Sequence, residues 1–203
     1  MCRVVRALLY SAAVREIVDS WQLADGRTGT FLALDQLFPV ARKRIAVREF
    51  MEDFRRRERM PLPVGVSLRW RVMPGLPSIL TDAAKLTLIL HRLLGNAIRF
   101  TTAGWIVVSA TDLPDRDKVC FRVDDTGPGI EPEHLAPLFE PLQCDATVGL
   151  AIVRRYVSLL DGEIAVRSER GIGTSFDVRL PYRPRPFATT TFRAASYEAA
   201  PCS

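Results

Sequence analysis

The first sixty residues follow two helical hydrophobic patterns separated by a break. Residues 3–20 have helical spacing and contain neither glycine nor proline, whereas Gly26 and Gly29 interrupt the pattern that follows. A second helical pattern covers about 41–59, and Pro61 stops it because proline cannot continue a helix. These residues therefore predict a helix, a linker and a second helix.

The middle of the chain changes from alternation to helical spacing. Residues 64–72 alternate apolar with small or charged side chains, which predicts a half-buried strand. Thr81 and Asp82 then supply a cap and a first-turn acid for a long helix. Its apolar side chains recur every three or four residues and form a core-facing stripe, made of Leu86, Ile89, Leu90, Leu93, Leu94 and Ala97.

A polar stripe on the same helix groups Arg92, Asn96 and Arg99, because residues three and four apart are neighbours on a helix surface. Two strands are predicted next, at about 104–111 and 118–124, and the second leads directly into a glycine-bearing loop. The polar stripe and the loop are the first candidates for chemistry.

The last third of the chain predicts a short helix near 131–138, a longer helix at 148–160, and a hairpin of strands at 163–168 and 174–180. Strands and helices in this order predict an α+β fold, a two-layer sandwich whose mixed sheet is covered on one face by helices. The proline-containing segment after Pro181 has no periodicity, and we expect a flexible tail there.

Composition narrows the class of protein. The 203 residues allow one domain with short appendages. No apolar run approaches the roughly 18 residues that span a bilayer, so we expect a cytoplasmic protein without a membrane segment. Four scattered cysteines form no CxxC pair, which disfavours a zinc site or a disulfide framework. The basic clusters at 42–44 and 55–57 alternate with acidic residues, and this favours a solvated helix face over nucleic-acid binding.

Asp125 is the carboxylate best placed for ligand recognition. It stands where a predicted strand ends, and Gly127 and Gly129 follow it, so that backbone can approach a ligand closely. A fixed carboxylate accepts a hydrogen bond from an exocyclic amine, which adenine offers and guanine lacks at that edge. An acidic residue beside two glycines is also a common turn, so these residues alone leave the turn open as the alternative.

Four further motifs accompany this loop and carry a family resemblance. In order and spacing, the set resembles the catalytic ATP-binding domain of sensor histidine kinases, in the superfamily of gyrase, Hsp90, histidine kinases and MutL. The resemblance covers about 38–183 and implies the Bergerat ATP-binding fold. Its motifs are AsnAlaIleArgPheThr at 96–101, AspThrGlyProGlyIle at 125–130, LeuPheGluPro at 138–141, GlyLeuAlaIleValArgArgTyrVal at 149–157 and GlyIleGlyThr at 171–174.

The resemblance assigns roles to these positions. It implies that Asn96 holds the Mg²⁺ that bridges the phosphates of ATP, a role suited to an amide oxygen. It makes Asp125 the residue that reads adenine. The other positions carried over to nucleotide binding are Arg99 near the phosphates, Phe100 beside the adenine, the loop residues Gly127, Gly129 and Ile130, Gly149 and Leu150 of the second glycine motif, and Thr174 near the base.

Two departures from the family pattern bear on activity. Four residues before Asn96, the family has Asn or Glu, whereas this chain has Arg92, a cation that cannot bind magnesium. Arg92 either pairs with a phosphate or marks a lost catalytic group. Only nine residues separate Phe139 from Gly149, and AspAlaThrValGly replaces the family's GlyThrGlyLeuGly, so the ATP lid is short. We expect weaker contacts to the triphosphate than to adenine.

The resemblance implies a function with an explicit rival. The leading function is ATP-dependent phosphotransfer in two-component signalling, to a histidine on another domain or chain, with weak or partner-dependent activity. The rival is a catalytically impaired module for protein interaction in a phosphorelay. Neither His91 nor His134 lies in the family's acceptor context, so the expected partner is a phosphoacceptor domain or a response regulator.

The expected organisation has three parts. Residues 1–37 form an N-terminal helix and linker, 38–183 the ATP-binding domain, and 184–203 the tail. The N-terminal helix is a candidate contact for a homodimer.

Overall fold

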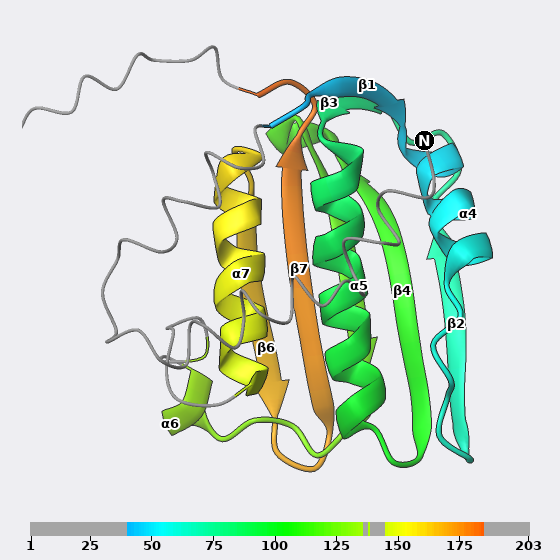
Figure 1. Ribbon diagram of the computed structural model, residues 1–203, viewed down its shortest axis with the longest axis vertical. Coiled ribbons are helices and arrows are strands. Elements are labelled where there is room, and N and C mark those ends of the chain that lie inside the picture. The colour runs from blue at the N-terminus through cyan, green and yellow to red at the C-terminus, as the bar shows by residue number, and fades with distance from the viewer. Residues whose placement is uncertain (1–39, 136–137, 139–144, 185–203) are drawn as a thin grey trace, which may run out of the picture.

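A five-stranded mixed sheet forms one layer of the protein (Figure 1). The computed structural model describes residues 40–135, 138 and 145–184. The strand order is β2-β4-β5-β7-β6, in which β2 and β4 run parallel and every other neighbouring pair is antiparallel. The strands are β2 (Val66–Val72), β4 (Gly104–Leu113), β5 (Lys118–Asp125), β6 (Glu163–Glu169) and β7 (Gly173–Pro181).

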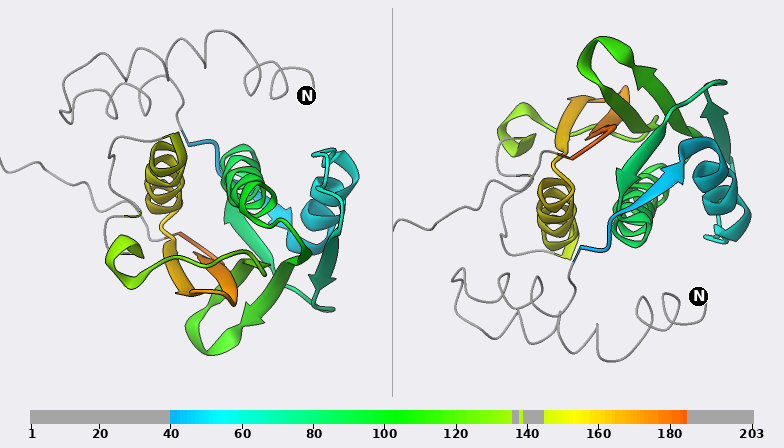
Figure 2. Two further views of the ribbon diagram at one scale, coloured as in Figure 1. Left: turned by 90° about the horizontal axis from the view of Figure 1, so that it is seen from below. Right: turned by 90° about the horizontal axis from the view of Figure 1, so that it is seen from above.

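Three helices cover one face of this sheet, and no described element covers the other (Figure 2). They are α4 (Val47–Arg57), α5 (Ala83–Phe100) and α7 (Asp145–Leu159). The apolar stripe predicted on α5 is buried in the core between the layers, together with the inward side chains of β4, β5 and β7. The predicted α+β sandwich is confirmed, because the alternating strands and the helical stripes present apolar faces to each other.

Asp82 is the N-cap of α5, one residue later than the predicted Thr81 cap, whereas it was expected as an acid of the first turn. Its Oδ1 accepts hydrogen bonds from the backbone N–H groups of Ala84 at 3.0 Å and Lys85 at 3.1 Å. These two donors have no partner within the helix, so the carboxylate satisfies them. Oδ2 accepts a further bond from the N–H of Ala41 at 2.8 Å, which ties the start of the described chain to the helix.

Residues 43–46 differ from the prediction that placed them in a helix. They form strand β1 (Lys43–Ala46), which pairs antiparallel with β3 (Ser78–Thr81), a strand that the hydrophobic pattern did not predict. Both segments are four residues long, too short for a period to be read from them. The pairing joins residues more than thirty positions apart, so only the tertiary fold selects the extended conformation.

Other boundaries lie close to expectation. The short helix near 131–138 is described as α6 (Pro132–Leu135), and a 3₁₀ turn, η1 (Pro114–Arg116), joins β4 to β5. The predicted helix at 3–20, the linker and the tail lie outside the described residues. Within the described part, no helix is long and apolar enough to cross a membrane.

Candidate functional site

Asp125 is the last residue of β5, the central strand of the five-stranded sheet. In register it stands between Ile106 of β4 and Thr174 of β7. Side chains alternate along a strand, so Asp125 shares the helix-covered face with buried Val123, whereas Asp124 points to the open face. The strand therefore places this carboxylate at the end of the core, on the helix-covered face of the sheet.

Backbone amides hold the Asp125 carboxylate in place. The N–H of Gly127 donates to Oδ1 at 2.8 Å, and a backbone hydrogen bond from Thr174 also stabilises the charged form. Burial nevertheless raises the pKa of Asp125 above its ordinary value, and the negative charge of Asp124 adds to the increase. A carboxylate held by amides alone retains acceptor capacity for a ligand.

Two glycines around Asp125 are required by close backbone packing. A Cβ on Gly173 would lie 1.9 Å from the carbonyl oxygen of Asp125, and the φ of Gly173 is +143°. A Cβ on Gly129 would lie 2.1 Å from the carbonyl oxygen of Glu169. The loop after β5 and the β6–β7 turn are therefore pressed together in a way that side chains would prevent.

The end of α5 forms another wall of the site. A Cβ on Gly127 would lie 3.3 Å from the carbonyl oxygen of Phe100, so the glycine loop runs directly below the last turn of the helix. The Phe100 side chain is 45% exposed, which leaves an aromatic surface beside the loop. The Arg99 guanidinium carbon lies 5.4 Å from the centre of this ring, within cation–π range.

Ser168 is a residue of this site that the sequence reasoning missed. Its Oγ accepts from the N–H of Ile130 at 2.8 Å and donates to the carbonyl oxygen of Gly173 at 3.0 Å. Because its own proton is used there, the 2.8 Å contact with Thr174 Oγ1 has Thr174 as the donor. Ser168 thus ties three motif positions together, yet in the sequence it is only a polar residue within an alternating strand.

The polar stripe of α5 ranges from half-buried to exposed. Arg92 and Arg99 are exposed and Asn96 is half-buried. In the described residues, neither Arg92 nor Asn96 is hydrogen-bonded to Asp125. Burial raises the pKa of the Tyr156 phenol on α7, and the positive charge of Arg92 partly opposes this increase. Arg92 therefore lies near α7.

Gly149 and Leu150 both lie within α7. The helix begins at Asp145 rather than near 148, and Gly149 lies inside it, as it did in the predicted helix at 148–160. A Cβ at Gly149 would meet nothing within 4 Å. Leu150 is 3% exposed and belongs to the hydrophobic core.

The polar stripe of α5 offers one oxygen ligand for magnesium, the side-chain amide of Asn96. In the described ranges, no group of three or more His, Cys, Asp or Glu side chains could hold a metal ion by itself. Mg²⁺ takes few protein ligands when phosphates and waters complete its octahedron. The half-buried amide of Asn96 fits that arrangement, in which the nucleotide supplies most of the remaining ligands.

Comparison with known proteins identifies the class. The family model for histidine kinase-, DNA gyrase B- and HSP90-like ATPases matches residues 81–184, and the chain belongs to this family. The autoinducer 2 sensor kinase/phosphatase LuxQ of Vibrio parahaemolyticus is 38% identical over 128 residues, which are 56% of this chain and 15% of that protein. The sensor histidine kinase RcsC of Escherichia coli is 37% identical over 121 residues, 54% of this chain and 12% of that protein.

Solved structures place the chain more narrowly. Full-length ShkA, crystallised with AMPPNP, shares 31% identity at a TM-score of 0.60, over 71% of this chain and 32% of that one. The catalytic domain of histidine kinase ThkA matches at a TM-score of 0.59 and 20% identity over 71% of this chain and 99% of the domain, and shows the fold alone. Within the family, the chain contains an ATP-binding domain of the sensor histidine kinase type.

Proposed function

We propose that this chain binds Mg-ATP and supplies the γ-phosphate for phosphorylation of a histidine on another domain or chain. The observation that carries the proposal is the Asp125 carboxylate, fixed at the end of β5 by the Gly127 amide at 2.8 Å and enclosed by glycines. That carboxylate stands at the position where the family resemblance expects adenine to be read.

Adenine recognition follows from the walls of the site. The exocyclic amine of adenine donates to Asp125, and guanine, with a carbonyl at that edge, does not. Phe100 offers its exposed ring beside the base. Thr174 donates to Ser168, which leaves the lone pairs of its hydroxyl oxygen to accept a further hydrogen bond.

Phosphate binding belongs to the polar stripe of α5. Asn96 would hold magnesium, which offsets the negative charge of the phosphates. Arg99, whose guanidinium carbon lies 5.4 Å from the centre of the Phe100 ring, would contact the phosphates. Arg92, exposed on the α7 side, can pair with a phosphate oxygen but cannot serve as a metal ligand or a base. We therefore expect binding by the chain alone and slow transfer without a partner.

The acceptor histidine comes from elsewhere. His91 lies on α5, where burial lowers its pKa and Glu58 partly opposes the shift. His134 lies on the four-residue helix α6. Neither is on a segment that can be delivered in line with a γ-phosphate, which phosphoryl transfer requires. The proposed partner is a histidine-bearing phosphoacceptor domain or a response regulator. The N-terminal segment is a candidate contact for a homodimer. The proposed place of action is the cytoplasm.

Calorimetric titration with ATP, ADP and GTP, each with and without magnesium, tests binding. We expect adenine nucleotides to bind in preference to GTP, and chelation of magnesium to weaken ATP binding. Asn96→Ala should remove that magnesium dependence while ADP without magnesium binds as before. An Asn96→Ala variant that keeps full magnesium dependence contradicts the metal role, and equal affinity for GTP contradicts the adenine role of Asp125.

Labelling with γ-labelled ATP tests transfer. Alone, the chain should not label itself on histidine, whereas a purified histidine-bearing domain of a sensor kinase should acquire acid-labile label. His91→Gln and His134→Gln are the controls, because label lost in either variant would make that residue the acceptor. ATP binding without transfer to any acceptor, together with ATP hydrolysis gained in Arg92→Asn, would identify the chain as the impaired interaction module.

A further inference from the structure

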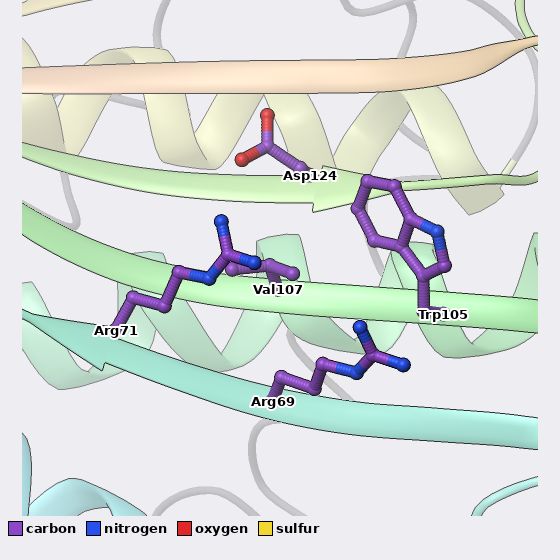
Figure 3. Close-up of a pocket in the computed structure, with 5 residues that line it drawn as sticks. All are labelled: Arg69, Arg71, Trp105, Val107 and Asp124. Carbon is purple, nitrogen blue, oxygen red and sulfur yellow. The ribbon is translucent and has the colours of Figure 1, made fainter.

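The open face of the sheet carries two different sets of charged side chains. Strand alternation places Arg69 and Arg71 of β2 on this face, together with Trp105 and Val107 of β4 and Asp124 of β5 (Figure 3). Further along the sheet, β5, β6 and β7 add a second set around one carboxylate, Asp177, with Arg122, Arg167 and Arg179. The two sets differ in whether their charges are paired.

The Asp177 set is internally satisfied. Its carboxylate is 2% exposed and accepts from Arg122 through two nitrogens, and it pairs with Arg167 and Arg179 at 3.1 Å each. Burial alone would raise the pKa of Asp177, but hydrogen bonding and charge from these arginines bring the pKa below its ordinary value. These three arginines therefore stabilise the fold through their ion pairs with Asp177.

Arg69 and Arg71 have no comparable carboxylate partner among the described residues. Both are exposed, two positions apart on β2, and β2 is an edge strand. Within residues 40–135, 138 and 145–184, neither guanidinium forms an ion pair with a carboxylate. Two neighbouring guanidinium groups that point to one side are a ready recognition element for carboxylate or phosphate.

The side chains on β2, β4 and β5 line a shallow pocket of about 240 Å³ on the open face of the sheet. Figure 3 shows both guanidinium groups and the Trp105 indole around it, with Asp124 on the opposite side. Trp105 is 38% exposed, and Ser175 donates to Asp124 Oδ1 at 2.5 Å. The pocket thus combines two cations, an aromatic surface and one hydrogen-bond acceptor.

This combination favours an acidic protein segment over a nucleic acid. The arginines bind carboxylates, Trp105 and Val107 offer contact to an apolar side chain, and Asp124 accepts a peptide N–H. A phosphodiester backbone has no N–H group to donate to Asp124, whereas a peptide backbone does. Exposed aromatic and arginine side chains are also the types that anchor protein interfaces.

We propose that the open-face pocket, defined by Arg69, Arg71, Trp105, Val107 and Asp124, is a docking site for a carboxylate-rich segment of a partner protein. The two terminal segments of the chain do not supply that charge. Residues 1–39 contain four acidic and four basic residues, and 185–203 contain one acidic residue and two arginines. Asp125 lies on the other face of β5, so docking and ATP binding use separate surfaces.

The test uses the full chain and two short blocked peptides, Glu-Glu-Leu-Glu-Glu-Leu and its glutamine counterpart, in calorimetric titrations at low salt. The acidic peptide should bind with a Kd below about 1 mM. The Arg69→Ser/Arg71→Ser double variant should bind it at least about tenfold more weakly. The matched control is Arg48→Ser/Arg55→Ser, which removes the same charge from the exposed face of α4 and should bind like the original chain.

Each other outcome overturns the proposal. Equal weakening in both double variants would mean unspecific attraction to net positive charge. Equal binding of the glutamine peptide would exclude carboxylate recognition, and no acidic-peptide binding at about 1 mM would exclude the site. Tighter binding of oligo-dT than of the acidic peptide at the same arginines would indicate nucleic acid, and displacement of the peptide by ATP would place it in the nucleotide site. Thermal unfolding of both variants confirms that they are folded, and failure of ATP binding leaves this test unaffected.

Discussion

Two carboxylates on opposite faces of the same sheet have opposite environments. Asp177, on the open face, is 2% exposed and surrounded by three arginines, and its pKa is lowered. Asp125, on the helix-covered face, is half-buried and held by backbone amides, and its pKa is raised. The fold stabilises the charge of the first and makes the charge of the second costly.

The difference separates a structural carboxylate from one available to a ligand. Side-chain cations use up the acceptor capacity of Asp177, whereas two amides leave capacity on Asp125. A desolvated carboxylate without a counterion lowers stability and gains from a donor supplied by a ligand. The comparison predicts that substitution of Asp177 lowers stability without affecting ATP binding, and that substitution of Asp125 weakens ATP binding without lowering stability.

The largest effect is expected from Gly173→Ala, which damages the support of Asp125. The new Cβ would lie 1.9 Å from the Asp125 carbonyl oxygen, at a φ of +143° that alanine disfavours. We expect a loss of about 3 kcal/mol in the free energy of unfolding, together with loss of ATP binding. Urea unfolding and calorimetry measure both.

The control for that prediction is Gly149→Ala. A Cβ at Gly149 meets nothing within 4 Å, and the residue lies inside α7. Alanine should therefore stabilise the protein by about 0.5–1 kcal/mol. Reduced ATP affinity in this stable variant would show that Gly149 serves the phosphates, as the family resemblance implies.

Asp125→Asn should separate binding from stability. Loss of the carboxylate acceptor is expected to weaken ATP binding by roughly tenfold to a hundredfold, the equivalent of about 1–3 kcal/mol. Stability at neutral pH should be unchanged or slightly higher, because a costly charge is removed. Unchanged ATP affinity in a folded variant would be incompatible with the proposed adenine site.

Asp177→Asn should do the reverse. Three arginines lose a charged partner that is 2% exposed, and the free energy of unfolding should fall by about 2 kcal/mol. ATP affinity should stay within about twofold of the original, because the residue lies on the opposite face from Asp125. A large loss of ATP affinity at full stability would show that the two faces are coupled.

The smallest effects concern pH. The lowered pKa of Asp177 gives stability above the unfolded value of about 3.9, and this stability is lost as pH falls through the folded pKa. The raised pKa of Asp125 has the opposite sign, so its ionisation removes stability as pH rises from about 3.9 through the folded pKa. Urea unfolding from about pH 3 to 7 should show the deficit of Asp177→Asn shrinking in acid and any gain of Asp125→Asn appearing only at higher pH.

The sequence alone determined the main elements and the principal candidate residue. Alternation in 64–72 and the helical stripe from Leu86 to Ala97 predicted a strand and a helix that the structure contains. The start of this helix was predicted to within one residue, because Thr81 was expected as the cap and Asp82 caps α5 instead. Asp125 was singled out by its place between a strand and two glycines. All of these depend on residues close together in the chain, which local patterns describe.

Only the tertiary structure decided the rest. Ser168 reaches Ile130 across 38 positions, and β1 exists because it pairs with β3. The requirement for glycine at 173 comes from the backbone of Asp125, and the open-face pocket joins side chains of three strands. Contacts of this kind link residues far apart in sequence, so no local period records them, and they form only when the whole sheet is assembled.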